Sequence, residues 1–449
     1  MIEYRNLRVA ILGAGSVGAQ VASLLLTHGD ELASRVGAGL ELVGVAVRDP
    51  KAVRTPAIPE HLITTDARSL ILGADIVVEL MGGLEPAREY LELAMNSGAD
   101  VITANKALLA THGPELFAIA EQVGAQLYYE AAVGGAIPII RPLRDSLAGD
   151  RVHRILGIVN GTTNYILDRM DTEGDTLEEA LAAATELGYA EADPTADIGG
   201  YDAAQKASIL ASLAFHTSVP LETVYREGIE HITHAQVLAA RKAGFVVKLL
   251  AVCERLVDAE TGVEGVSARV HPALVSRDHP LAAVHGANNA VFLEAEAAGS
   301  LMFYGAGAGG IQTASAVLGD VVSAARRHVI GGPGVAESTS SELPVLPISS
   351  VTTRYQITLE VADQPGVLAT VATIFSQHGV SVEAVQQSPH TPALADLGTE
   401  LGTADLPATA TLVIGTHEAT ESALAATVTS LEANGSVAEV TSVLRVEGL

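Results

Sequence analysis

A stretch of nineteen residues between Gly188 and Lys206 carries the side chains with the most obvious chemistry. It reads GYAEADPTADIGGYDAAQK and ends with Asp202 and Lys206, four positions apart in a segment of helical pattern. Residues four apart lie on one helix face about one turn apart, so the carboxylate and the amine should meet. Neighbouring charges adjust the protonation of such a lysine in either direction, which suits it to exchange a proton with a substrate hydroxyl. The stretch is a candidate acid/base site.

The same spacing also has a simpler explanation, because acid and lysine pairs four apart are common on solvated helices. The preceding loop favours a functional site, since it adds Glu191, Asp193 and Asp197 together with paired glycines. Lys106 is a second candidate. It follows the apolar run VITAN at the expected carboxyl end of a sheet strand, where α/β proteins bind ligands, although a surface lysine at a helix start is the alternative.

A glycine-rich turn, GAGSVG at residues 13–18, lies between an apolar run at 7–12 and a helical segment at 16–27. This strand, turn and helix context is the one in which GxGxxG binds a dinucleotide. Gly13 would permit the turn, Gly15 would let the backbone approach a pyrophosphate, and Gly18 would let helix and strand pack closely. Free N–H groups at the helix start would hold the anion. The pattern favours dinucleotide binding over a glycine turn in an unrelated α/β fold.

The choice of nucleotide depends on the end of the next strand, VAVRDP. An acid there usually binds the ribose 2'-hydroxyl of NAD, but here Arg48 comes first and Asp49 second. Arg48 could instead bind a 2'-phosphate with two hydrogen bonds, unless it is simply an exposed arginine. The sequence favours NADP and leaves NAD open.

The elements that must position these residues alternate in type. Apolar runs at 7–12, 40–47, 76–79, 101–103 and 126–129 are separated in part by helical segments at 86–97 and 114–123. This alternation predicts a parallel sheet covered on both faces. We expect an α/β protein with a Rossmann-like dinucleotide-binding domain over residues 1–137, completed by a helix at about 306–330.

Three further regions follow. Residues 138–305 mix strand-like runs with alanine-rich helices, which predicts an α+β domain for substrate binding, catalysis and dimerisation. Residues 331–350 are rich in Gly, Pro and Ser and indicate a linker. Residues 351–449 have the pattern of a small βαββαβ domain, within the size range of an independent unit.

Composition excludes several functions. The formal charge of -27 opposes binding to a phosphate backbone, so nucleic acid is not an expected partner. No apolar run reaches the roughly 18 to 20 residues of a membrane span, and the N-terminus lacks the features of a signal peptide. With Cys253 alone and fourteen scattered histidines, neither a disulfide nor a transition-metal site is supported. We expect a cytoplasmic protein.

Several segments together resemble the homoserine dehydrogenase family. They are ILGAGSVG, VITANKALLA, YYEAAVGGAIPII, GIVNGTTNYIL, GYAEADPTADIGGYDAAQK and YGAGAGGIQTASAVLGD, and they cover most of residues 7–330 in the expected order. The fourth of these carries Asn160 and Thr163, which are either active-site wall residues or helix caps. The chain is too short for a fused aspartate kinase, which indicates the monofunctional form.

The resemblance assigns roles to individual residues. It implies that Lys206 is the general acid/base and that Lys106 lies near the nicotinamide and the substrate. Glu191 and Asp202 would hold the substrate, with Asp197 beside them, since a carboxylate is the natural partner for an α-ammonium group. Cofactor contacts would come from Ala14, Val17, Gly188, Glu191 and Gly309. By this resemblance a monovalent cation such as sodium would bind the carboxylate of Glu130 and the carbonyl oxygens of Val133, Gly135 and Ile137. Oxygen ligands are the ones that hard cations favour.

The C-terminal region resembles an ACT domain, a module that binds amino acids. Asp363, Pro365 and Gly366 fit its first turn, DQPG. The implied effector is threonine, while an oligomerisation module without a ligand is the alternative.

Taken together, these features predict an NAD(P)-dependent homoserine dehydrogenase that interconverts L-homoserine and L-aspartate 4-semialdehyde. The resemblance places it in threonine, methionine and isoleucine biosynthesis, as a homodimer or homotetramer. Two alternatives stay open: another oxidoreductase on the same scaffold, and an amino-acid-sensing regulatory protein on a catalytically inactive one.

Overall fold

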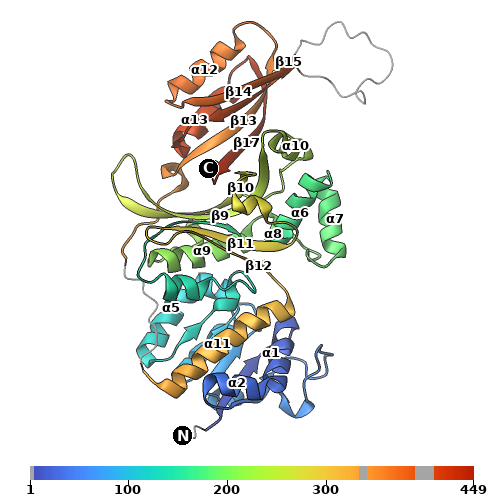
Figure 1. The fold of residues 1–449 in the computed structure, drawn as a ribbon, viewed down its shortest axis with the longest axis vertical. Coiled ribbons are helices and arrows are strands. Elements are labelled where there is room, and N and C mark those ends of the chain that lie inside the picture. The colour runs from blue at the N-terminus through green and yellow to red at the C-terminus, as the bar shows by residue number, and fades with distance from the viewer. Residues whose placement is uncertain (1–4, 333–340, 390–408, 449) are drawn as a thin grey trace.

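The computed structural model describes residues 5–332, 341–389 and 409–448. Three tiers follow one another along the longest axis of the molecule (Figure 1). The glycine-rich turn lies in the first tier, the stretch from Gly188 to Lys206 in the second, and the DQPG turn in the third.

The first tier is built on a parallel sheet of six strands in the order β3-β2-β1-β4-β5-β6. This is the strand order of a Rossmann fold, whose ligand site lies where the order reverses, here beside β1. The strands are β1 (Leu7–Leu12), β2 (Leu40–Ala46), β3 (Ile63–Thr64), β4 (Ile76–Glu79), β5 (Asp100–Thr103) and β6 (Leu127–Tyr128).

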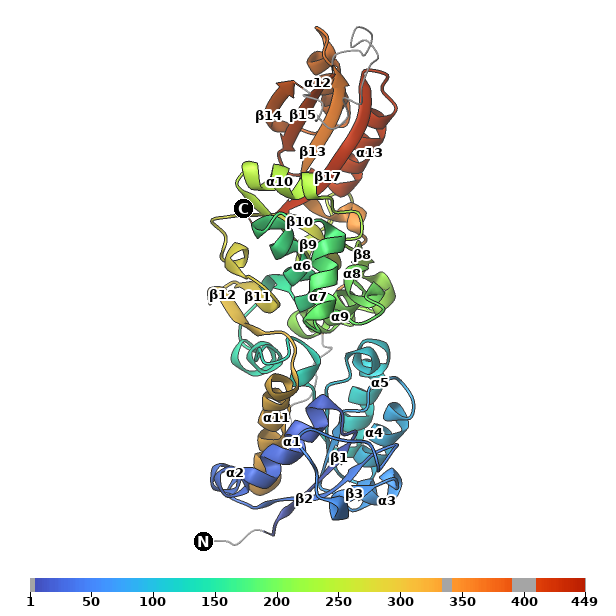
Figure 2. The same ribbon diagram turned by 90° about the vertical axis from the view of Figure 1, so that its right-hand side faces the viewer.

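Helices cover both faces of this sheet, as its uninterrupted apolar strands require. Val9 and Ile11 of β1 pack toward one set of helices, and Ala10 and Leu12 toward the other. The two sets lie on opposite sides of the strands in Figure 2. The first set is α1 (Ser16–Thr27), α2 (Gly29–Val36) and α11 (Gly310–Ile330); the second is α3 (Ala67–Leu72), α4 (Ala87–Asn96) and α5 (Lys106–Val123).

The second tier is a mostly antiparallel sheet, β12-β11-β7-β9-β10, with helices packed on one face. Its strands are β7 (Val152–Ile158), β8 (Tyr225–Arg226), β9 (Phe245–Val257), β10 (Glu264–Ser276), β11 (Asn288–Ala295) and β12 (Gly299–Ala306). Its helices are α6 (Gly161–Thr172), α7 (Leu177–Glu186), α8 (Thr195–Ile198), α9 (Tyr201–Phe215) and α10 (His234–Lys242). Helix α9 also packs against α5, so one apolar core runs through the first two tiers.

The third tier has the predicted βαββαβ order and a core of its own. It contains β13 (Thr352–Ala362), α12 (Val367–Gln377), β14 (Val382–Pro389), β15 (Thr409–Thr416), β16 (Ala419–Thr420), α13 (Glu421–Glu432) and β17 (Val437–Glu447). Strand β17 pairs in parallel with β10, in the register Ala273 with Arg445. The sheets of the second and third tiers are therefore one sheet of eleven strands, which the sequence did not predict.

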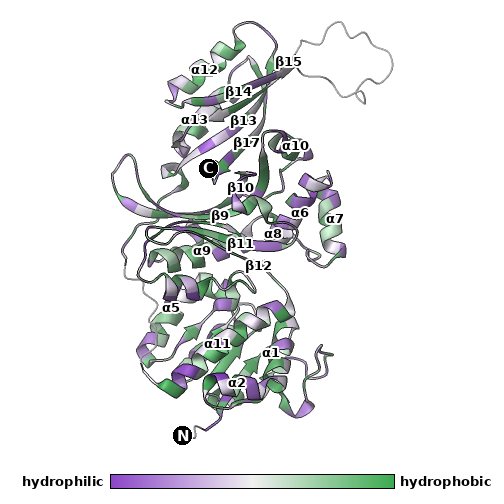
Figure 3. Ribbon diagram, viewed as in Figure 1, coloured by the Kyte–Doolittle hydropathy of each residue, from purple (hydrophilic) through white to green (hydrophobic). Residues whose placement is uncertain are grey.

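Hydrophobic residues concentrate in the strands and on the inner faces of the helices, and hydrophilic ones on outward surfaces (Figure 3). Within the described ranges, no helix combines the length and the apolar character needed to cross a membrane.

Candidate active site

Asp202 joins two lysines from different tiers. Its Oδ2 lies 2.7 Å from Nζ of Lys206, and its Oδ1 lies 2.9 Å from Nζ of Lys106. Lys206 is 9% exposed, and its Nζ also donates a 2.6 Å hydrogen bond to the Val159 carbonyl. The two lysines and the acid predicted from the sequence are thus gathered at the boundary between the first and second tiers.

Helix starts place Lys106 and Asp202, and Lys206 follows Asp202 one turn later in α9. Lys106 is the first residue of α5, whose N-cap Asn105 accepts a 3.1 Å hydrogen bond from the Leu108 N–H. Asp202 lies in the first turn of α9, which follows Gly200 at a φ of 76°. A left-handed conformation of this kind favours glycine, so the turn that aims Asp202 depends on Gly200.

Asn160 connects the acids of this cluster. Its Nδ2 donates to Asp197 at 2.7 Å and to Asp202 at 2.9 Å, while its Oδ1 caps α6 by accepting from the Thr163 N–H at 2.9 Å. Both roles considered for Asn160 are therefore present. Sequence reasoning missed Val159 because it acts through a backbone carbonyl, which no side-chain pattern indicates. It also missed Asn105, although an asparagine before a helix is a recognisable cap signal.

The pKa values of the two acids in the cluster, Asp202 and Asp197, are shifted in opposite directions. Burial alone would raise the pKa of Asp202, but the nearby charges of Lys206 and Lys106 outweigh it and hold this pKa below its ordinary value. Burial raises the pKa of Asp197, against the opposing effect of the hydrogen bond from Asn160. Asp202 is consequently a firmly ionised counter-charge, whereas Asp197 gains a proton more readily.

The glycine-rich turn has an open side where a phosphate would lie. A Cβ on Gly13 would meet the Leu80 carbonyl oxygen at 2.6 Å, and one on Gly18 would meet the Gly13 carbonyl oxygen at 2.1 Å. Gly15 has nothing within 4 Å of that position and caps α1, which has no acidic residue in its first turn. Exposed N–H groups at such a helix end fit a pyrophosphate. The neighbouring Ala14 and Val17 are half-buried.

Backbone contacts place the start of α11, after Gly309, and the end of β2, before Arg48, beside the same turn. Gly309 caps α11, and the next residue packs against the backbone of Ser16 at the start of α1. Arg48 is exposed two residues after Ala46, whose carbonyl accepts a 2.9 Å hydrogen bond from the Gly13 N–H. These contacts place the start of α11 and the end of β2 beside the glycine-rich turn.

Gly188 and Glu191 have no direct bond to the cluster among the described residues. Gly188 follows α7 at a φ of 75°, and Glu191 is exposed. No hydrogen bond or ion pair between described residues joins Glu191 to Asp202 or to either lysine. The exposed Asp193 accepts a 3.1 Å hydrogen bond from the Thr195 N–H, and the Thr195 side chain also bonds to it.

The turn expected to bind a cation contains Glu130, whose carboxylate is bonded to other protein groups. The Glu130 carboxylate is 1% exposed and accepts from Ile139 N, Ile140 N and the backbone and side chain of Arg141 at 2.6–3.0 Å. Both oxygens are thus engaged by hydrogen-bond donors, which ties the carboxylate to residues 139–141. No group of three His, Cys, Asp or Glu able to hold a metal occurs in the described ranges.

Backbone oxygens in this turn fit a hard cation better. No described residue donates a hydrogen bond to the carbonyl oxygens of Val133, Gly135 or Ile137. The turn is pressed against Ala306 and Gly307, close enough that a Cβ on Gly135 would meet the Gly307 carbonyl oxygen at 2.4 Å. Such carbonyls are suitable oxygen ligands for a monovalent ion.

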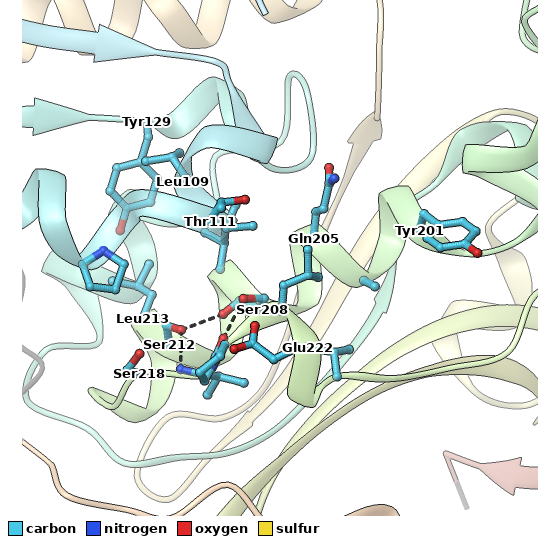
Figure 4. A pocket seen from close by; sticks show the side chains of 18 of the residues that line it. Leu109, Thr111, Tyr129, Tyr201, Gln205, Ser208, Ser212, Leu213, Ser218 and Glu222 are labelled. Atoms are coloured by element: carbon cyan, nitrogen blue, oxygen red, sulfur yellow. Dashed lines mark hydrogen bonds between the residues drawn. The ribbon is translucent and has the colours of Figure 1, made fainter. Parts of the chain in front are cut away.

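A cavity of about 760 Å³ lies between α5 and α9 but does not hold this chemistry. Tyr129, Tyr201, Gln205 and Glu222 are among its lining residues, and the hydroxyls of Ser208 and Ser212 bond within the wall (Figure 4). This cavity is lined by neither lysine, nor by Asp202, nor by the glycine-rich turn. It is therefore separate from the cluster.

A Rossmann-type sheet with a glycine-rich turn after β1, two lysines joined by an acid at the boundary of the next tier and a C-terminal βαββαβ unit are the features of a nicotinamide-dependent oxidoreductase. Comparison with known families gives the same answer. The homoserine dehydrogenase family matches residues 138–322, its NAD-binding domain matches 13–130, and the ACT domain matches 355–412. The chain belongs to the homoserine dehydrogenase family.

Individual relatives agree over the full length. The chain is 50% identical to the homoserine dehydrogenase of Corynebacterium glutamicum, covering 98% of this chain and 95% of that one. It is 51% identical to that of Mycobacterium tuberculosis, covering 99% of each. A crystal structure of a homoserine dehydrogenase from Thiobacillus denitrificans superposes with a TM-score of 0.89 at 35% identity, over 100% of both chains.

Proposed function

We propose that the cluster of Lys106, Asp202 and Lys206 interconverts L-homoserine and L-aspartate 4-semialdehyde, with NADP as the preferred nicotinamide and NAD possible. The observation that carries the proposal is the contact of one carboxylate with two lysines at the boundary of the nucleotide tier. The alternative of an amino-acid sensor on an inactive scaffold is not favoured, because such a protein has no need of this arrangement.

The donors of Lys206 explain how a proton could move. An ammonium group has three N–H donors, and two are used by Val159 and Asp202. The third is available to the substrate oxygen, so Lys206 would protonate the carbonyl during reduction and take the hydroxyl proton during oxidation. A bound nicotinamide supplies or accepts the hydride. Lys106 keeps two donors for orienting the same oxygen, and Asp202 holds both ammonium groups in place.

Substrate recognition would rest on the acids. The α-ammonium of homoserine needs a carboxylate partner, and Asp197 and Glu191 are two acids of the segment before α9 that the lysines do not contact. Gly188 would then line the nicotinamide end of the pocket. We assign these roles from the position of the loop between α7 and α9.

The direct test is an absorbance assay for reduced cofactor with homoserine and NADP+. The Lys206→Ala variant should bind NADPH as tightly as the parent chain, yet lose about a hundredfold or more in kcat, because general acid/base groups contribute about 10²- to 10⁴-fold. Full turnover by this variant would refute the role of Lys206. No turnover by the parent chain with either nicotinamide, in sodium or potassium buffer, would refute the activity.

Cofactor preference is assigned to Arg48. Its exposed guanidinium, near the turn at Gly13, is suited to two hydrogen bonds with a 2'-phosphate. A hyperthermophilic archaeal homoserine dehydrogenase solved in complex with NADPH has the same fold, with a TM-score of 0.61 at 28% identity over 74% of this chain. The Arg48→Ala variant should lose about tenfold or more of its preference for NADP+ over NAD+, measured as a ratio of kcat/KM values. An unchanged ratio would count against this role.

A monovalent cation, with sodium as the first candidate, is proposed at the carbonyl oxygens of Glu130, Val133, Gly135 and Ile137. It would stiffen the turn that packs against residues 306–307, next to the start of α11. Thermal unfolding followed while NaCl replaces a tetramethylammonium salt at constant ionic strength tests this, since only specific binding raises the midpoint.

The ACT domain is proposed to bind threonine. A cavity of about 350 Å³ lies at the turn between β13 and α12 and is lined by Asp363, Pro365, Gly366 and Gln387. The N-terminus of α12 would face the effector carboxylate and Asp363 its ammonium group. This placement supports feedback control within threonine, methionine and isoleucine biosynthesis.

Assembly as a homodimer or homotetramer in the cytoplasm is also proposed. The edge strand β12 carries Leu301, Met302 and Phe303 only half-buried, and an unpaired edge invites pairing with another chain. Light scattering of the purified protein measures the mass directly, and a monomer would contradict the proposal.

A further inference from the structure

The start of α9, which carries Asp202, is held from outside the helix. No side chain caps α9, and its N-cap is Gly200. A helix start without a side-chain cap leaves its first turn dependent on tertiary contacts. These contacts come from residues 225–229, hereafter the clamp segment, which begins with β8.

The clamp segment grips the two glycines before α9. Arg226 donates a hydrogen bond to the Gly199 carbonyl, and its guanidinium lies 3.5 Å from the ring centroid of Tyr201. The Ile229 N–H donates to the Ile198 carbonyl at 2.7 Å. Gly228 packs so closely that a Cβ there would meet the Ile198 carbonyl oxygen at 2.3 Å. The clamp segment and the turn before α9 therefore cannot move independently.

The clamp segment is itself anchored at Glu227. The Glu227 N–H donates to the Val270 carbonyl of β10 at 2.8 Å, and its carboxylate accepts from the Tyr225 hydroxyl. Both carboxylate oxygens also accept from Nη1 of Arg445, at 3.0 and 3.1 Å. Arg445 belongs to β17 of the ACT domain, so this ion pair crosses between tiers.

Arg445 is held in turn by the ACT domain. It is 8% exposed, and its Nε and Nη2 donate to Oε1 of Glu421, the first residue of α13, at 3.0 and 2.5 Å. The Tyr355 hydroxyl of β13 donates to the same Glu421 oxygen at 2.7 Å. A buried ion pair is costly to break once formed, because the remaining charge loses its partner.

We propose that Arg226, Glu227 and Arg445 are positioning residues for the reaction: they fix the first turn of α9, and through it Asp202 and Lys206, by tying that turn to the ACT domain. The inference rests on the proposed roles of Asp202 and Lys206. None of the three positioning residues contacts the two lysines, so their effect would be indirect.

Three single variants and one double variant test the proposal in the full-length chain. Glu227→Gln, Arg445→Met and Arg226→Ala should each lower kcat/KM for homoserine about tenfold and move the pH at which it is half-maximal, because Asp202 no longer sits between the lysines. The dissociation constant for NADPH, measured by its own fluorescence, should not change. The double variant Glu227→Gln/Arg445→Met should lose no more than the worse single variant, as expected for residues acting as one unit.

Arg154→Met is the matched control. Arg154 also joins the second tier to β17, through Glu447, but it does not touch the clamp segment. This variant should keep the kcat/KM and pH profile of the parent chain.

Three results would overturn the proposal: an unchanged kcat/KM and pH profile in Glu227→Gln, losses that multiply in the double variant, or an equal loss in Arg154→Met. Failure of the proposed function would appear separately, as full activity of Lys206→Ala, whatever the clamp variants do.

Discussion

A single carboxylate, Asp202, organises the site at the scale of residues. It forms ion pairs with Lys106 of α5 and Lys206 of α9. Their charges keep it ionised despite its burial. Sequence spacing predicted the contact with Lys206, since four positions in a helix fix it. The contact with Lys106 depended on the tertiary fold, and only the family resemblance placed that lysine nearby.

Glu130 shows a contact that the sequence did not indicate. Its carboxylate oxygens accept hydrogen bonds from backbone N–H groups at residues 139–141 and from the Arg141 side chain. No pattern in the sequence predicts these bonds, because backbone donors are present everywhere. The carboxylate therefore helps to fix the turn that is proposed to bind a cation.

A buried lysine outside the site gives a prediction about pH. Burial lowers the pKa of Lys248 to about 8, although its Nζ donates to Asn164 at 2.9 Å and to the Val284 carbonyl at 2.7 Å. The unfolded chain keeps this proton up to about pH 10.4. Between these values the unfolded chain binds the extra proton, so this lysine makes the folded state more stable as pH rises and less stable as pH falls through 8.

The Lys248→Met variant should lack this dependence. Relative to the variant, the parent chain should gain as much as about 3 kcal/mol of unfolding free energy between pH 7.5 and 10.5. Urea denaturation at a series of pH values measures the difference. Parallel curves for the two proteins would show that Lys248 has an ordinary environment.

At the scale of elements, the spacing of apolar residues in the sequence predicted most strands and helices, because strands and helices repeat with different periods. The strands at 40–47 and 76–79 and the helix at 86–97 were predicted within about a residue of β2, β4 and α4. The start of α5 was misplaced, because Pro114 was taken as the first residue of a helix that begins at Lys106. The proline lies inside α5 on its exposed side, so the helix continues through it with one backbone N–H donor fewer.

The glycine-rich turn contains glycines with two different roles: Gly18 is needed for packing, and Gly15 is expected to be needed for nucleotide binding. Gly15→Ala should leave the unfolding free energy within about 1 kcal/mol of the parent value, since the Cβ enters open space, but weaken NADPH binding about tenfold or more. Gly18→Ala should instead lower stability by more than about 2 kcal/mol, because its Cβ meets the backbone of Gly13. Denaturant unfolding and NADPH fluorescence titration distinguish them. Equal effects of both variants on stability would contradict this division.

At the scale of the whole molecule, the sequence indicated three units but not how they join. A strand's neighbour in another unit is not encoded in its own alternation, so the pairing of β17 with β10 was not predictable. The joint is also ionic, since Arg269 of β10, 1% exposed, lies 3.1 Å from Glu447 of β17. This interface makes the ACT domain part of the catalytic sheet.

Effector control should therefore be separable from catalysis. Asp363→Ala should raise the threonine concentration for half-inhibition at least about tenfold while leaving kcat unchanged, because Asp363 lines only the ACT cavity. Glu432→Ala, an exposed acid at the end of α13, serves as the control. If threonine inhibits both variants and the parent chain equally, the effector binds elsewhere.

Because the first two tiers share one apolar core, a nucleotide bound to the first tier should also stabilise the second. Side chains of α4, α5, α6 and α9 belong to one contiguous cluster, whereas most of the ACT domain has a separate one and Leu444 of β17 joins the shared cluster. The shared portion should open as one cooperative unit. Amides in α6, which lies in the second tier, should thus exchange with deuterium more slowly once NADPH fills the first tier, by the same free energy as amides beside the ligand.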